Sequence, residues 1–244
     1  MPRPEPIDWT LESPRVSTAP ADDPWALDYA DLEGEPLHMR NYAVRSYRLG
    51  RDRFLIRGVV DDRKHASTWL PDDGSMMVMH HMVLDLLVEF PTLVILEAKM
   101  VMEAHPHEVC IEIEDKYEQL QGVSIARGFT HKVREMFGGP RGCTHATALL
   151  QAMAPVAVQT TWGMMMANRL DDAIERGEDT RAEMLMPLAE DRAESVARSL
   201  NTCHVWDEQG PVVAHLLGGG TIELPLPLRR RMARREAAPE GQPG

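Results

Sequence analysis

The stretch that decides the fold is MVLDLLVEFPTLVILEAKMVM, residues 82–102. On both sides of Pro91-Thr92 its apolar side chains recur at every second position, the period of a β-strand with one buried face. Asp85 and Glu89 lie on the other face of the first half. We therefore predict two antiparallel strands joined by a turn. Their predicted core-facing residues are Met82, Leu84, Leu86, Val88 and Phe90, then Val94, Leu96, Ala98, Met100 and Met102.

A β-hairpin is predicted upstream of this ribbon. Residues 43–49 and 54–60 have strand composition and flank Gly50, which suits a turn. A polar loop at residues 61–75 separates the hairpin from the ribbon.

Helical periodicity begins after Cys110. A Gly-Gly-Pro sequence at residues 138–140 is expected to end the first helix. Another helix is predicted to start near Cys143, and Pro155 is expected to kink or interrupt it. The apolar stripe of the first helix has a spacing of four residues and consists of Ile125, Phe129, Val133 and Phe137.

The last third of the chain has weaker patterns. A charged helix is predicted over roughly residues 180–200, and a strand pair over residues 203–206 and 212–217. The predicted fold class is α+β, with an antiparallel sheet covered on one side by helices.

Composition divides the chain into three parts. Residues 1–37 are rich in proline and acidic residues, and we expect an extended or disordered leader. Residues 38–224 are predicted to form a single α+β domain. Residues 225–244, with five arginines, are expected to be a basic flexible tail.

The charge balance excludes several classes of protein. The 244 residues carry a formal net charge of -12, whereas nucleic-acid binders have a basic face and anionic membranes attract basic segments. No apolar run approaches a membrane span, and the N-terminus does not resemble a signal peptide. We therefore expect a cytoplasmic protein that binds a small molecule or a protein partner, and neither nucleic acid nor membrane.

Cysteine and histidine residues give the main chemical signal. The chain has three cysteines, Cys110, Cys143 and Cys203, an odd number that argues against a disulfide framework. Cys143 is predicted at a helix start, where the dipole favours a thiolate, and His145 follows closely. Histidines at positions 80, 81, 105, 107 and 204 also lie at predicted element boundaries. Thiolates and imidazoles together suit zinc, iron or an iron–sulfur cluster, although buried cysteines are more often structural.

Several short motifs occur along the chain in the order VDDRK at residues 60–64, His81-Met82, LQG at residues 120–122, GCTH at residues 142–145 and Cys203-His204. Together they resemble one bacterial family, catalogued as domain of unknown function 2889. The GCTH sequence is the most specific of them. The resemblance spans about residues 40–217 and implies one folded unit, but no reaction.

The layout of residues 80–159 also resembles the scaffold proteins on which iron–sulfur clusters are assembled. In those proteins three cysteines converge on one site from a strand start, a strand end and a helix start. By position, this resemblance implies a site formed by His81 (or His80), Cys110 and Cys143, with His145 as a fourth ligand.

The leading hypothesis is therefore a protein that binds zinc or iron through His81, Cys110, Cys143 and His145, and that acts on a small organic molecule if it is an enzyme. One alternative is a metal-free enzyme, with Cys143 as nucleophile and His145 or His204 as base. A second alternative is a non-catalytic accessory or binding protein. The sequence does not define the oligomeric state.

Overall fold

The computed structural model describes residues 37–126, 128–178, 196, 197, 199–221 and 226–237. Its elements, in chain order, are β1 (His38–Arg48), β2 (Arg53–His65), η1 (Ala66–Thr68), β3 (Met76–Glu89), β4 (Ile95–Ala104), η2 (Glu108–Leu120), α1 (Phe129–Phe137), η3 (Gly139–Arg141), α2 (Thr144–Arg176), η4 (His204–Trp206), α5 (Pro211–Leu217) and α6 (Leu226–Ala237), where η denotes a 3₁₀ helix.

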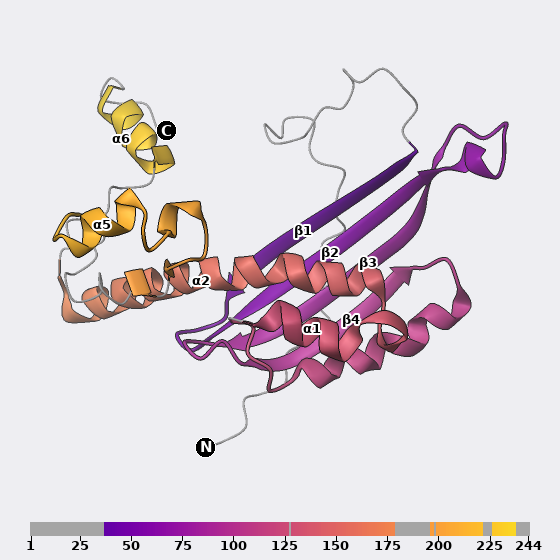
Figure 1. The fold of residues 1–244 in the computed structure, drawn as a ribbon, viewed down its shortest axis with the longest axis horizontal. Coiled ribbons are helices and arrows are strands. Elements are labelled where there is room, and N and C mark those ends of the chain that lie inside the picture. The colour runs from indigo at the N-terminus through magenta and orange to yellow at the C-terminus, as the bar shows by residue number, and fades with distance from the viewer. Residues whose placement is uncertain (1–36, 127, 179–195, 198, 222–225, 238–244) are drawn as a thin grey trace.

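The four strands form one antiparallel sheet in the order β1-β2-β3-β4, and α1 and α2 lie across one face of it (Figure 1). This arrangement confirms the predicted α+β class. It also confirms the hairpin and the long ribbon, although β1 and β2 are longer than predicted.

The main core lies between the sheet and the two helices. Side chains at alternate strand positions meet the apolar stripes of α1 and α2, because successive strand residues point to opposite faces. Fully buried members of this core include Phe54, Ile56, Met82, Leu84 and Leu86 from the sheet, and Val133, Phe137, Leu149, Leu150 and Met153 from the helices.

The predicted faces of the ribbon are correct for β3 and partly wrong for β4. A register shift between Leu87 and Val88 pairs Val88 with Ile95, so Ile95 is fully buried in place of Val94 and Leu96. This register shift is a β-bulge, and its extra residue changes which strand positions point toward the core. The prediction of a single buried face is also incomplete, because Val83 and Leu87 on the opposite face of β3 are buried as well.

Helix α2 is continuous from Thr144 to Arg176 and is not interrupted at the exposed Pro155. It lies very close to β2 at Gly58, where an added Cβ would be 2.6 Å from the Sδ of Met153. A larger residue at this position would force the side chain of Met153 to shift, so glycine favours the close approach of the helix to the strand.

The predicted C-terminal strand pair is wrong. Residues 204–206 form η4, and residues 211–217 form α5, which begins with Pro211 after Gly210 and buries Val213 and Leu216. Short apolar runs do not distinguish strand from helix by periodicity, and proline in the first turn favours a helix.

Two other predictions fall partly or wholly outside the described residues. They are the leader predicted over residues 1–37, of which the structure describes only Leu37, and the charged helix predicted over residues 180–200, most of which is not described. Within the predicted basic tail, residues 226–237 form helix α6. Among the described helices, none combines the length and apolar character needed to cross a membrane.

Candidate metal centre

The candidate site begins with Asp62, near the end of β2. Asp62 pairs with Arg40 of β1 on one side and with His80 of β3 on the other. Residues paired across strands carry their side chains on the same face. The register therefore gathers these three side chains on the face that the helices cover.

Asp62 is almost completely buried and accepts several hydrogen bonds. Arg40 donates Nε–H to Oδ1 at 3.1 Å and Nη2–H to Oδ2 at 2.9 Å. His38 Nε2 contacts Oδ1, and His80 Nδ1 lies 2.8 Å from Oδ2. Burial alone would raise the pKa of this carboxyl, but the hydrogen bonds from Arg40, His38 and His80 outweigh burial and hold the pKa well below 3.8. Asp62 is therefore ionised.

His145 reaches the same carboxylate from the first turn of α2. Its Nε2 lies 3.4 Å from Asp62 Oδ2, and its ring stacks on His80 with centroids 3.8 Å apart. Burial, together with the charges of His80 and Arg40, lowers the pKa of His145 to about 4. The imidazole is therefore neutral at neutral pH and can offer a lone pair.

Asp62, His80 and His145 each present one ligand atom, and the three atoms lie within 4.8 Å of one another. The side chains are one buried carboxylate and two half-buried imidazoles. Two histidines and one carboxylate form a donor set used for zinc and for non-haem iron(II). This group could hold a metal ion.

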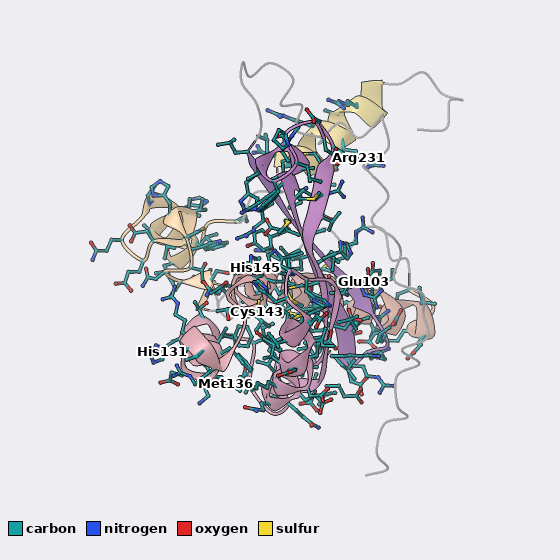
Figure 2. All side chains as sticks on the ribbon, turned by 90° about the vertical axis from the view of Figure 1, so that its right-hand side faces the viewer. Glu103, His131, Met136, Cys143, His145 and Arg231 are labelled. Carbon is teal, nitrogen blue, oxygen red and sulfur yellow. The ribbon has the colours of Figure 1, made fainter. Side chains whose placement is uncertain are left out.

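Cys143 lies next to His145, and both are labelled in Figure 2. It is the residue before α2, and its Sγ is 3.6 Å from Nδ1 of His145. Its backbone N–H donates to the hydroxyl of Tyr117 at 3.0 Å. Burial raises the pKa of Tyr117 to about 12, so that hydroxyl keeps its proton. Cys143 is thus fixed beside the imidazole, on the side away from Asp62.

The structure brings together only some of the predicted site residues. Cys143 and His145 are neighbours, as the GCTH sequence indicates. His81 lies on the opposite face of the sheet, 3.2 Å from Asp61 and 3.5 Å from Glu103, because adjacent strand residues point in opposite directions. His80, the other residue of the pair, is the one that faces the site.

Cys110 does not join the candidate metal group. It lies in η2, is half-buried and packs against the main core. The group that could hold a metal ion consists of Asp62, His80 and His145, and no cysteine cluster is found among the described residues. Cys203 and His204 are exposed beside and within η4.

Sequence reasoning did not assign Asp62, Arg40 or His38 to the site. Asp62 follows the apolar run of β2 and resembles a solvated turn residue, yet the strand continues to His65. A carboxylate two residues beyond buried Val60 shares its face, and this alternation is the signal that could have identified Asp62.

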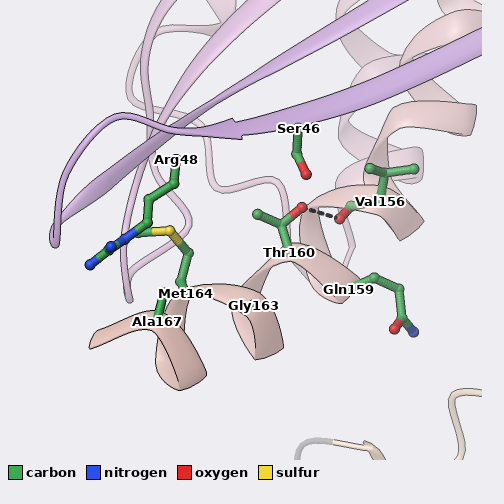
Figure 3. A pocket seen from close by; sticks show the side chains of 8 residues that line it. All are labelled: Ser46, Arg48, Val156, Gln159, Thr160, Gly163, Met164 and Ala167. Atoms are coloured by element: carbon green, nitrogen blue, oxygen red, sulfur yellow. Dashed lines mark hydrogen bonds between the residues drawn. The ribbon is translucent and has the colours of Figure 1, made fainter. Parts of the chain in front are cut away.

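A groove between β1 and α2 lies apart from this group (Figure 3). Arg48 supplies its one charged side chain and is tied to Asp171 at 2.5 Å. The groove's other lining residues are Ser46, Val156, Gln159, Thr160, Gly163, Met164 and Ala167. It offers no cluster of ligating or acid–base side chains.

Comparison with known proteins gives one match. A family model described as "Protein of unknown function (DUF2889)" matches residues 38–159, half of the chain. These residues include the whole sheet, both partners of the His80–His145 stack, and Cys143. No curated protein and no solved structure matches the chain.

Proposed function

The chain belongs to the DUF2889 family, and we propose that it binds a divalent transition metal ion, zinc or iron(II), through Asp62, His80 and His145. The observation that carries this proposal is the convergence of two imidazole nitrogens on one oxygen of a buried carboxylate. His80 Nδ1 lies 2.8 Å and His145 Nε2 lies 3.4 Å from Asp62 Oδ2.

These distances suit a shared ion. Two ligand atoms bound tetrahedrally at about 2.1 Å from one ion lie about 3.4 Å from each other. The three ligand atoms therefore need only small side-chain movements to surround an ion.

Protonation also supports the proposal. A metal ligand must offer a lone pair, and the lowered pKa of His145 provides a neutral imidazole at neutral pH. The hydrogen bonds from Arg40 do not prevent Asp62 from binding an ion, because the two oxygens of the Asp62 carboxylate together have about four lone-pair positions. With Nε2 on the metal, Nδ1–H of His145 points to Cys143, an arrangement that orients a ligating histidine through its second nitrogen.

Three protein ligands leave a coordination position for water or a small organic molecule. A metal ion with an open position lowers the pKa of bound water or polarises a carbonyl oxygen. The centre is therefore suited to a reaction on a small molecule, with Asp62, His80 and His145 holding the ion.

The test compares two adjacent aspartates whose side chains lie on opposite faces of the sheet. Wild-type protein, loaded with zinc or iron(II) and dialysed, is expected to retain about one ion per chain by elemental analysis. Asp62→Asn removes a ligand charge and should lose the ion, whereas Asp61→Asn should retain it. A folded wild type that retains no ion, or an Asp62→Asn variant that matches it, would falsify the proposal.

A second candidate function is a cysteine nucleophile, favoured by one specific alignment. Cys143 Sγ, His145 and Asp62 form a line, with 3.6 Å from sulfur to Nδ1 and 3.4 Å from Nε2 to Oδ2. This is the order of nucleophile, base and orienting carboxylate in thiol enzymes. It requires the His145 proton on Nε2, whereas metal binding requires the proton on Nδ1.

Thiol alkylation separates the two candidates. If Cys143 is a nucleophile, iodoacetamide should modify it in metal-free protein at least about tenfold faster than it modifies Cys110. In the His145→Gln variant, iodoacetamide should then modify both thiols at the same rate. Equal rates at both thiols would exclude this function. Nitrogen chemical shifts of His145, which report its tautomer, give an independent reading.

A further inference from the structure

We propose that the ligand of this centre is a small oxyanion, bound between the metal ion and the guanidinium of Arg40, with Lys64 at the entrance. This inference rests on the metal site proposed above and adds the chemical class of its ligand. Three observations carry it: the charge of the loaded site, the position of Arg40 and the face on which Lys64 lies.

Charge is the first argument. Asp62 contributes -1 and Arg40 contributes +1, and histidines that bind a metal ion do so as neutral imidazoles, so the protein groups around the ion sum to zero. A divalent ion brings the sum to about +2 in a site whose carboxylate is only 2% exposed. A buried uncompensated charge is costly, so an anion in the open coordination position is favoured.

Arg40 is placed to bind that anion. Its Nη2 donates to Asp62 Oδ2, the same oxygen that His80 and His145 approach, so the guanidinium lies next to the proposed ion. About a third of the Arg40 side chain is exposed, so a ligand can reach it from solvent. Asp62 takes two of the five N–H donors of the guanidinium, so donors remain for a carboxylate or phosphate ligand.

Lys64 adds a second cation on the same face of the sheet. It follows Asp62 by two residues on β2 and pairs with His38 of β1, so it shares the face of Asp62. Its Nζ lies 5.8 Å from the centre of the Trp69 ring, which holds the side chain in place. The chain as a whole carries -12, so this local group of cations runs against the overall composition.

Carboxylates and phosphates share this recognition chemistry, and two probes distinguish them. Acetate and inorganic phosphate are titrated separately, by calorimetry, into zinc-loaded protein freed of excess metal and into metal-stripped protein. Zinc-loaded wild type is expected to bind at least one probe ten times more tightly than stripped protein. The probe that binds more tightly identifies the class.

Variants then test the role of each cation. Arg40→Gln should retain about one zinc per chain and lose at least tenfold in affinity for the probe, and Lys64→Gln should lose several-fold. Arg45→Gln, an exposed arginine of β1 on the opposite face, serves as the matched control and should bind like wild type.

The outcomes separate this inference from the metal proposal. Zinc retained by wild type, with probe binding unchanged in both Arg40→Gln and Lys64→Gln, overturns the oxyanion inference and leaves the metal site standing. Equal probe affinity in loaded and stripped protein also overturns it. Elemental analysis is done first. If wild type does not retain zinc, both the metal proposal and the oxyanion inference are wrong. If Arg40→Gln does not fold, the probe affinity of Lys64→Gln decides whether the oxyanion inference holds.

Discussion

His80 and His81 are adjacent, yet the sheet sends them to different faces. His80 contacts Asp62 and stacks on His145, whereas His81 contacts Asp61 and Glu103. The same division separates Asp61 from Asp62. Residue identity alone is therefore a poor guide to this site, because the direction of each side chain decides which cluster it joins.

The histidine pair gives a direct prediction. His80→Ala removes a proposed ligand and should reduce retained zinc from about one ion per chain to a small fraction, since loss of one of three ligands usually destroys a site. His81→Ala should retain the ion. Elemental analysis after dialysis measures both, and a loss confined to His81→Ala would contradict the assignment of faces.

His145 predicts a pH dependence of stability in the metal-free protein. Its folded pKa, about 4, lies below the ordinary value of 6.5, so the unfolded state binds more protons between these values. The stabilisation is fully present above pH 6.5 and is lost as the pH falls toward 4.

Urea unfolding at several pH values between about 7 and 4 measures this effect. Relative to His145→Gln, the free energy of unfolding of the wild type should fall by about 1–3 kcal/mol over that range. Parallel pH curves for the two proteins would show that His145 does not titrate in this way.

At the scale of elements, the approach of α2 to β2 fixes where His145 lies. A Cβ added at Gly58 of β2 would lie 2.6 Å from Met153 and 3.1 Å from Leu149 of α2. A side chain here would separate the helix from the strand. The glycine and the position of the site are thus linked through the packing of one helix.

Two glycines form a matched test of this packing. Gly58→Ala should lower the free energy of unfolding by about 1–3 kcal/mol, because the new methyl overlaps Met153. Gly163→Ala, inside α2 with no atom within 4 Å of the added Cβ, should raise it by about 0.5–1 kcal/mol. Thermal and urea unfolding measure both changes, and destabilisation by both variants would contradict the account.

At the scale of the whole molecule, the proposed ligands join parts that are distant in sequence. Asp62 and His80 come from neighbouring strands, and His145 comes from the helix that covers the sheet. A bound ion would therefore connect α2 to the sheet and stabilise the fold as a unit.

Metal addition should accordingly raise the melting temperature. Free zinc at about 100 times its dissociation constant should stabilise the folded state by about 2.7 kcal/mol, which corresponds to several degrees for a chain of this size. Asp62→Asn should show no such shift, while Asp61→Asn should match wild type. A shift of equal size in Asp62→Asn would place the ion elsewhere.

The sequence by itself determined the strands of the ribbon, the start of α2 and three residues of the apolar stripe of α1, Phe129, Val133 and Phe137, whereas the predicted fourth, Ile125, lies before the helix. Each depends on local periodicity or on a glycine and proline stop, and both act over a few residues. The nearness of Cys143 to His145 was determined in the same way, since the two are separated by one residue at a helix start.

Only the tertiary structure decided which residues form the site. The bulge near Ile95 changed the phase of β4, and residues 204–206 and 211–217 form helices although their apolar pattern is also compatible with strands. Asp62 meets a histidine 18 residues away and another on a distant helix. Such contacts depend on register and helix docking, which are set by the burial of the whole core and not by the identity of the ligands.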